Sequence, residues 1–199
     1  MSDDTLVQRV RNGDQEAYEL LVKLHFKSVY HMAFRYMKDH AAADDVVQDS
    51  FVKAFRSLHL FRGDSSFKSW IMRIAINTAK NSLRSKGRRP ESQLDKQIIA
   101  SHHQGFKRLE REQSLEILRA AIEELPTKQR QTIELRIFEE MTFKEVAVAM
   151  DCPFNTAKAN FRHGLENLRK LLSEVENGKG LAELRLLFEG WNKEEGTHL

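Results

Sequence analysis

Apolar residues recur along this chain at the three-to-four-residue spacing of α-helices, and this spacing predicts the elements. Four helices are predicted in the first half, over residues 4–11, 15–37, 40–59 and 66–86. Asn12-Gly13 breaks the first of them, and Asp14 and Asp39 are suitable N-caps for the second and third. The chain has only 9 Gly and 3 Pro, which favours helices over a turn-rich β fold.

The second half repeats this helical pattern after an interruption. Residues 90–109 lack a sustained apolar period and contain Gly and polar residues, as linkers do. Four more helices are then predicted, over 110–124, 127–139, 142–150 and 154–174. We therefore expect an all-α protein with two small helical domains that fold separately. The predicted parts are a domain at 1–89, a flexible linker at 90–109, a domain at 110–176 and an extension at 177–199.

The last two predicted helices form a helix-turn-helix pattern. Thr142 is expected to cap the first helix, Asp151-Cys152-Pro153 makes the turn, and Asn155 or Thr156 is expected to cap the second. The inward positions of the second helix are apolar or small: Ala157, Phe161, Gly164, Leu168 and Leu172. Its other face carries Lys158, Arg162 and Arg169. Such a helix can enter the major groove of DNA, although a helical pair without a DNA role remains the alternative.

Composition excludes several classes of protein. The single cysteine, Cys152, excludes an internal disulfide framework and a multi-cysteine zinc site. No signal peptide and no apolar run long enough to cross a membrane is present, so we expect a cytoplasmic protein without membrane insertion. The histidines are dispersed, and no Gly-rich phosphate loop or nucleophile elbow appears. We therefore expect no enzyme activity, no metal and no cofactor.

Charge is distributed in blocks although the net charge is only +3. Residues 39–50 contain four Asp and neither Lys nor Arg, whereas residues 62–89 contain eight Lys or Arg and one Asp. An acidic block followed by a basic one can hold two different partners, one of them rich in phosphate.

The acidic block lies on the third predicted helix. On a helical wheel the apolar residues form one stripe, which we expect in the core: Val47, Phe51, Ala54, Phe55 and Leu58. Asp44, Asp45, Gln48 and Asp49 lie on a different arc. This arc is either a solvated acidic face or a docking surface for an Arg-rich partner helix.

The fourth predicted helix carries a polar stripe. Arg73, Asn77, Lys80 and Arg84 recur at helical spacing, with Trp70 at the edge. Such a stripe suits a nucleic-acid strand, because cations bind phosphates, an amide reads base edges and an indole stacks on bases. A plain solvated basic face is the alternative, and Trp70 can equally belong to the core.

Together these residues resemble the extracytoplasmic-function (group IV) sigma factors of bacterial RNA polymerase. The resemblance covers about Leu6 to Leu172. Its most specific stretches are DDVVQDSFVKAFRSL (44–58), FRGDSSFKSWIMRIAINTAKNSLR (61–84), LPTKQR (125–130) and MTFKEVAVAMDCPFNTAKANFR (141–162). Four such blocks in this order are a specific signal, whereas one alone is a moderate one.

The resemblance implies a function and the residues that perform it. It implies a subunit that binds core RNA polymerase, through the β′ clamp helices and the β flap, and directs transcription from promoters with −10 and −35 elements. The implied polymerase-binding residues are Asp44, Asp45, Gln48, Asp49 and Phe51. Those for the −10 element are Phe61, Arg62, Asp64, Trp70, Arg73, Asn77, Lys80 and Arg84. Those for the −35 element are Asn155, Thr156, Lys158, Ala159, Arg162 and His163. An anti-sigma factor is a further implied partner.

Some residues depart from the family pattern. Ala159, Asn160 and Leu165 replace polar or basic residues of the usual recognition helix, which puts the −35 readout in question. A stand-alone helix-turn-helix regulator would explain the second domain but would leave the acidic face and basic stripe of the first without a purpose. The promoter sequence, the inducing signal, the identity of an anti-sigma factor and the role of residues 177–199 do not follow from the sequence.

Overall fold

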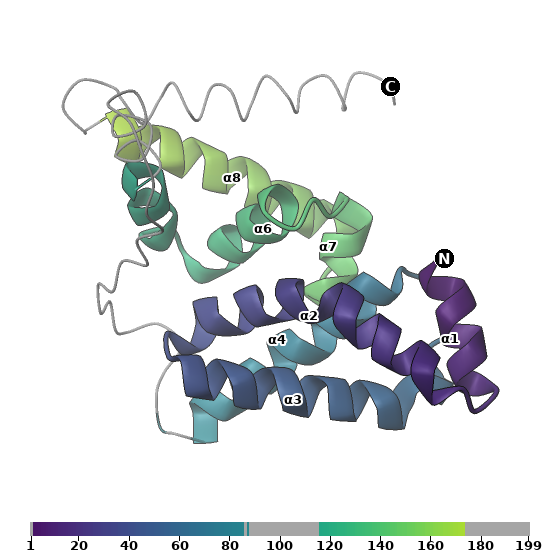
Figure 1. The fold of residues 1–199 in the computed structure, drawn as a ribbon. Helices are drawn as coiled ribbons and strands as arrows, with labels where there is room; N and C mark the ends of the chain where they lie inside the picture. Colours follow the sequence, from purple (N-terminus) through teal and green to yellow (C-terminus); the bar gives the residue numbers. More distant parts are fainter. Residues whose placement is uncertain (1, 86, 88–115, 174–199) are drawn as a thin grey trace, which may run out of the picture. The chain divides into compact units, whose positions relative to one another are not determined.

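A computed structural model describes residues 2–85, 87 and 116–173 of the chain (Figure 1). Within these residues all regular structure is helical, which confirms the predicted all-α class. The contacts divide the chain into two compact units, one made of residues 1–96 and 135–157 and the other of 97–134 and 158–199. The predicted linker at 90–109 and extension at 177–199 lie outside the described residues.

The first unit contains four α-helices from the N-terminal part of the chain. They are α1 (Asp3–Arg11), α2 (Gln15–Met37), α3 (His40–Ser57) and α4 (Phe67–Ser85), with a 3-10 turn, η1 (Leu58–Leu60), after α3. The predicted caps are confirmed: the carboxylate of Asp14 accepts from the amide of Ala17 at 3.1 Å, and that of Asp39 accepts from Ala42 at 2.8 Å. Each cap uses an otherwise unpaired amide, and so fixes where its helix begins.

Helices α2, α3 and α4 pack against one another and enclose the core of this unit (Figure 1). Leu21, Val29, Val47 and Ile71 are buried at their contacts. Helix α1 adds Leu6 and Val7 to the same core, and Asp3 at its start contacts Nε2 of His25 at 2.9 Å. The exposed faces of α3 and α4 are thereby held on a rigid scaffold.

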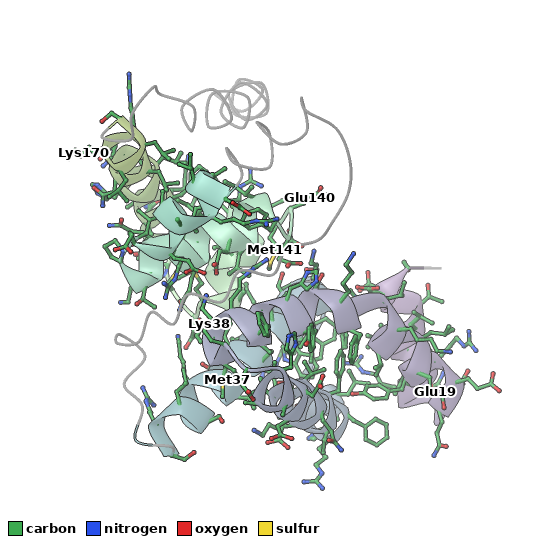
Figure 2. All side chains as sticks on the ribbon, turned by 60° about the vertical axis from the view of Figure 1, so that its left-hand side comes forward. Glu19, Met37, Lys38, Glu140, Met141 and Lys170 are labelled. Carbon is green, nitrogen blue, oxygen red and sulfur yellow. The ribbon has the colours of Figure 1, made fainter. Side chains whose placement is uncertain are left out.

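A short helix from further along the chain also belongs to this unit. Helix α7 (Phe143–Ala149) packs against α4, and Met141 and Val146 are buried in the core cluster that includes α4. Thr142 caps α7 as predicted, in a reciprocal capping box with Glu145. Glu140, in the turn before α7, is exposed and has a left-handed φ of 53° (Figure 2).

In the second unit, the described residues are helical over 116–123 and in α6 (Thr127–Ile137) and α8 (Phe154–Ser173). The division between the units falls within α6 and α8, because residues 135–137 of α6 and residues 154–157 of α8 belong to the first unit. The predicted inward set of α8 is buried as expected: Ala157, Phe161, Gly164, Leu168 and Leu172.

The predicted cap of α8 at Asn155 or Thr156 is wrong. The helix begins at Phe154, directly after Pro153, and Asn155 and Thr156 lie in its first turn. The amides of Thr156 and Ala157 donate to the carbonyl of Pro153 at 2.9 and 3.1 Å. The fixed φ of Pro153 is compatible with a helix that starts at the next residue, and its carbonyl accepts the first helical hydrogen bonds, so the helix begins before Asn155 and Thr156.

Candidate functional site

The acidic face of α3 is exposed as a set. Asp44, Asp45, Gln48 and Asp49 all point away from the core, whereas Val46 and Val47 between them are buried. Asp49 lies 3.9 Å from Lys53 one turn later, an exposed pair that contributes little to stability. The face therefore offers three carboxylates and an amide to a partner.

A largely apolar groove of about 660 Å³ lies next to this face, between α2 and α3. Asp44 and Gln48 belong to both, and the floor and walls are mainly apolar: Tyr18, Val22, Phe26, Val47, Phe51, Val52 and Phe55, with Arg56 beside them. A partner helix with an apolar stripe and a flanking cation could place the stripe in this groove and the cation beside the carboxylates of α3. This groove was not predicted from the sequence, because two helices form it and neither shows it alone.

Two phenylalanines of the predicted α3 core stripe differ in position. Phe51 is buried, with 6% of its surface exposed, and lines the groove from below. Phe55 was predicted in the core, but this was wrong: it is 49% exposed. Its ring packs against that of Tyr18, with centroids 4.8 Å apart, at the wall of the groove. Burial raises the pKa of Tyr18 to about 12, so this wall carries no charge near neutral pH.

The polar stripe of α4 is present on the outer side of the helix. Asn77 and Arg84 are exposed, and Arg73 and Lys80 are half-buried. Phe67, Ile71 and Ala75 face the core on the other side. The amide of Asn77 therefore lies in the middle of a row of cations and is accessible to a ligand.

Two aromatic residues predicted to contact DNA are buried. Trp70 is 7% exposed and Phe61 is 4% exposed, so neither ring presents a face on which a base can stack. Their ring centroids lie 5.2 Å apart, and both contact the ring of Phe67. The structure therefore does not support the stacking role considered for Trp70. The alternative, that Trp70 belongs to the core, holds, because its hydrophobic ring packs against Phe61 and Phe67 although the residue lies at the edge of the stripe.

The loop before α4 is fixed at both ends. A guanidinium nitrogen of Arg11 donates to the carbonyl of Phe61, and Oγ of Ser66 accepts from the amide of Ser69 at 3.2 Å. Between them Arg62 and Asp64 are exposed, and Gly63 has a φ of +81° that other residues rarely adopt. The loop thus presents Arg62 and Asp64 next to the start of the α4 stripe.

Helix α8 presents the predicted recognition residues outward. Asn155, Thr156, Lys158, Arg162 and His163 are exposed, and Ala159 is half-buried. Glu166 contacts two of them, with 3.8 Å to Nε of Arg162 and 3.3 Å to Nδ1 of His163. Glu166 was not predicted as part of this surface, although its spacing of three and four residues from these side chains indicates that they are neighbours on one helix face.

Other chemistry is lacking in the described part of the chain. No group of three His, Cys, Asp or Glu residues there is placed to hold a metal ion. None of the helices that the structure describes is long and apolar enough to span a membrane. These surfaces define an all-helical protein with an exposed acidic helix face, a basic helix stripe and a helix-turn-helix pair.

Comparison with known proteins assigns the family. The model of Sigma-70 region 2 matches residues 21–89 and that of Sigma-70 region 4 matches residues 115–168. The ECF RNA polymerase sigma-E factor of Salmonella typhimurium (strain LT2) is 38% identical over 180 residues, 84% of this chain and 94% of its own. The RNA polymerase sigma-H factor of Pseudomonas aeruginosa is 35% identical over 184 residues, 87% of this chain and 95% of its own.

Solved structures agree. CnrH in complex with the cytosolic domain of CnrY is similar with a TM-score of 0.63 and 26% identity, over 86% of this chain and 97% of that one. The sigma factor RpoE in complex with the anti-sigma factor NepR from Bartonella quintana shares the fold, with a TM-score of 0.62 and 21% identity, over 79% of this chain and 97% of that one. The chain belongs to the ECF family of RNA polymerase sigma factors, and it acts in transcription initiation.

Proposed function

We propose that each of the three surfaces has a separate task in this initiation factor: the α3 face with its groove binds core polymerase, the α4 stripe reads the −10 element, and α8 reads the −35 element. The observation that carries the proposal is the exposure of Asp44, Asp45, Gln48 and Asp49 beside an apolar groove. A stand-alone DNA-binding regulator has no use for such a surface. No catalytic step is part of this proposal.

Polymerase docking uses both chemistries of the α2–α3 surface. The carboxylates attract and orient a basic helix, and the groove gives affinity by burying apolar side chains. The β′ clamp helices are the proposed partner, and the β flap is the proposed second contact on the polymerase. Phe51 acts from beneath, since it is buried and supports the groove floor.

Promoter reading uses the two basic surfaces. Arg62, Arg73, Lys80 and Arg84 bind phosphates of the −10 strand, while Asn77 pairs with a base edge and Asp64 lies in the adjoining loop. Phe61 and Trp70 form the hydrophobic base that fixes this loop and helix. On α8, Asn155, Thr156, Lys158, Arg162 and His163 face the −35 element, and Ala159 contributes only apolar contact.

The partners of the solved relatives suggest a regulator. CnrH and RpoE are held in complexes with CnrY and NepR, and NepR is an anti-sigma factor. We extend this to a similar antagonist for the present chain. Its place of action is the cytoplasm, where core polymerase transcribes.

Run-off transcription with core polymerase on a genomic promoter library tests the proposal. The wild-type chain should start transcripts at a defined promoter set, and Asp45→Lys/Asp49→Lys should lose both this activity and co-purification with polymerase. Glu19→Lys/Glu124→Lys is the matched control, because both of these glutamates are exposed and lie outside the groove (Figure 2 labels Glu19). Undiminished polymerase binding by the folded Asp45/Asp49 variant would reject the docking assignment.

A further inference from the structure

An aromatic side chain occupies the first position of α8, the second helix of the helix-turn-helix pair. The helix begins at Phe154, and 44% of the surface of this residue is exposed. Asn155 and Thr156, which follow it, are exposed too, and both carry hydrogen-bonding groups. The phenyl ring has no such group, so any contact that it makes with a partner is apolar. A single exposed apolar residue is common on protein surfaces, so its surroundings decide whether it has a role.

The ring of Phe154 is held by a second ring from α7. It meets the ring of Phe143 edge to face, with the centroids 6.5 Å apart and an angle of 87° between the planes. In such a pair each ring offers only an edge or one face to the other. The rest of the Phe154 ring is therefore left accessible, in agreement with its exposure.

Phe143 is itself fixed in place. It is half-buried, and the guanidinium of Arg136 lies 4.8 Å from the centroid of its ring. Nη1 of Arg136 also donates to the carbonyl of Met141 at 2.7 Å, which ties the guanidinium to the turn before α7. A cation over a ring and an edge-to-face ring pair are both attractive through the charge distribution of the ring. The Phe154 ring is therefore ordered before DNA binds, which lowers the entropy cost of a contact.

The place of Phe154 on α8 agrees with contact in the major groove of DNA. In a helix-turn-helix pair, the N-terminal residues of the second helix reach base edges. Lys158 is exposed and lies four residues after Phe154, so the two side chains are neighbours along one edge of the helix. Phe154 is therefore one turn closer to the N-terminal end of α8 than Lys158, which the proposed function places at the −35 element.

The major groove offers a suitable apolar group to such a ring. Thymine carries its C5-methyl group there, whereas the edges of the other bases present mainly hydrogen-bond donors and acceptors. Phenylalanine is one of the side chains that make apolar contact with this methyl group. Against a donor or acceptor the ring would leave a polar group without a partner, which disfavours the other bases.

We propose that Phe154 is a specificity-determining residue of this sigma factor, and that it reads one thymine of the −35 element by packing on the C5-methyl group. The inference rests on the proposed −35 role of α8. It adds an apolar base contact to the hydrogen bonds and phosphate contacts that Asn155, Thr156 and Lys158 can make. It also requires that the −35 element contains an A·T pair at the position that Phe154 meets.

Replacement of thymine by deoxyuridine tests this contact without any change in the protein, because uracil pairs with adenine but lacks the methyl group. The full chain with core polymerase is titrated, in a mobility-shift assay, against a duplex promoter from the run-off library. Each thymine of the −35 element, on either strand, is replaced in turn. Binding should weaken about fourfold at one position, which corresponds to the burial of one methyl group. Equal affinity for thymine and uracil at every position, or a −35 element without an A·T pair, would overturn the proposal.

Variants of Phe154 show whether this residue makes the contact. Phe154→Ala should bind the thymine and uracil promoters equally at that position, and Phe154→Gln, a second helix-forming replacement without the ring, should do the same. Phe138→Ala is the matched control, because Phe138 is 47% exposed and lies outside α7 and α8. It should respond to uracil as the wild type does. A wild-type response in Phe154→Ala or Phe154→Gln would show that another residue reads the methyl group.

Failure of the −35 assignment itself would have a different result. If α8 does not contact this element, a scrambled −35 sequence should leave the affinity of the wild-type complex unchanged, and so should Lys158→Ala. If scrambling weakens binding but uracil has no effect at any position, α8 reads the element and the methyl contact of Phe154 is rejected.

Discussion

Gly164 of α8 lies directly against Ile133 of α6. A Cβ at position 164 would be 2.7 Å from Cδ1 of Ile133 and 3.3 Å from its Cγ1. Cδ1 is the far end of the Ile133 side chain, but Ile133 is fully buried, so any shift of this atom must be taken up by its core neighbours. The glycine therefore permits the close approach of the two helices, beside the hydrogen bond that Asn167 donates to Gln129 at 2.8 Å.

Gly164→Ala should therefore destabilise the C-terminal helices although alanine favours helix. The gain in helix propensity is about 0.5–1 kcal/mol, whereas overpacking of a filled core costs about 1–3 kcal/mol. Ile133→Val removes Cδ1, and the double variant should recover most of the loss. A double-mutant cycle in urea unfolding measures this coupling; additive effects would show that the contact is not the cause.

The sequence correctly predicted features of the structure that depend on one helix alone. The caps at Asp14, Asp39 and Thr142 and the inward set of α8 follow from local spacing, and all are confirmed. Features that depend on two elements were not predictable in this way. Phe55 has the helical spacing of the core residues of α3, but its ring packs on Tyr18 of α2 at the wall of the groove. Trp70 is buried because its ring packs against those of Phe61 and Phe67.

The groove at Phe55 yields a prediction about polymerase binding. Phe55→Ala should weaken binding to core polymerase by about 1–2 kcal/mol, the scale of a partly buried aromatic contact. Folding should change little, because the ring is 49% exposed. Leu24→Ala is the matched control, since Leu24 is an exposed apolar residue of α2 outside the groove. Competition binding with labelled polymerase compares the affinities of the two variants. An equal loss of affinity in Phe55→Ala and Leu24→Ala would exclude the groove from the interface.

The burial of His25 predicts a pH dependence of stability. Burial lowers the pKa of His25 below its usual 6.5, although Asp3 opposes this shift. A histidine with a lowered folded-state pKa adds stability that is fully present above the unfolded value and is lost as pH falls through the folded one. The free energy of unfolding should therefore decrease as pH falls below about 6.5.

Denaturant unfolding at several pH values between neutral and mildly acidic checks this effect. His25→Gln should reduce the slope with pH, whereas His59→Gln, at an exposed position, should keep it. If His25→Gln retains the wild-type slope, the proton uptake belongs to other groups. The lowered pKa of His31, which burial and Arg35 cause, makes it the next residue to replace.

On α8, Glu166 changes what is expected from its cationic neighbours. Lys158→Ala should weaken binding to all −35 sequences and reduce the salt dependence, as loss of a phosphate contact does. Arg162→Ala should cost ~1–3 kcal/mol and relax preference at one base pair. Because Glu166 lies beside Arg162 and His163, Glu166→Gln should strengthen binding without changing the preferred sequence.

Electrophoretic mobility shifts of the polymerase complex on DNA with altered −35 sequences test Lys158→Ala, Arg162→Ala and Glu166→Gln. Unaltered DNA affinity in all three variants would exclude α8 from the interface.

Asn77 gives the sharpest test of the −10 assignment. It is exposed in the middle of a stripe in which Arg73, Lys80 and Arg84 are cations, and it alone offers a donor and an acceptor together. Its amide can therefore distinguish bases, which a cation on a phosphate cannot do. The loop with Arg62 and Asp64, held by Gly63 in a left-handed turn, adjoins the start of the same helix and could wall a pocket for an extruded base.

Transcription from promoters randomised across the −10 element decides between this role and a solvated side chain. Asn77→Ala should keep the fold and polymerase binding but lose discrimination at one base by about 1–3 kcal/mol, since the amide that pairs with the base edge is removed. Asn81→Ala is the matched control, because Asn81 is an exposed asparagine one turn later on α4 and lies outside the assigned set. A ranking of −10 sequences that is the same in wild type and Asn77→Ala would mean that Asn77 faces water and that the stripe binds phosphates only.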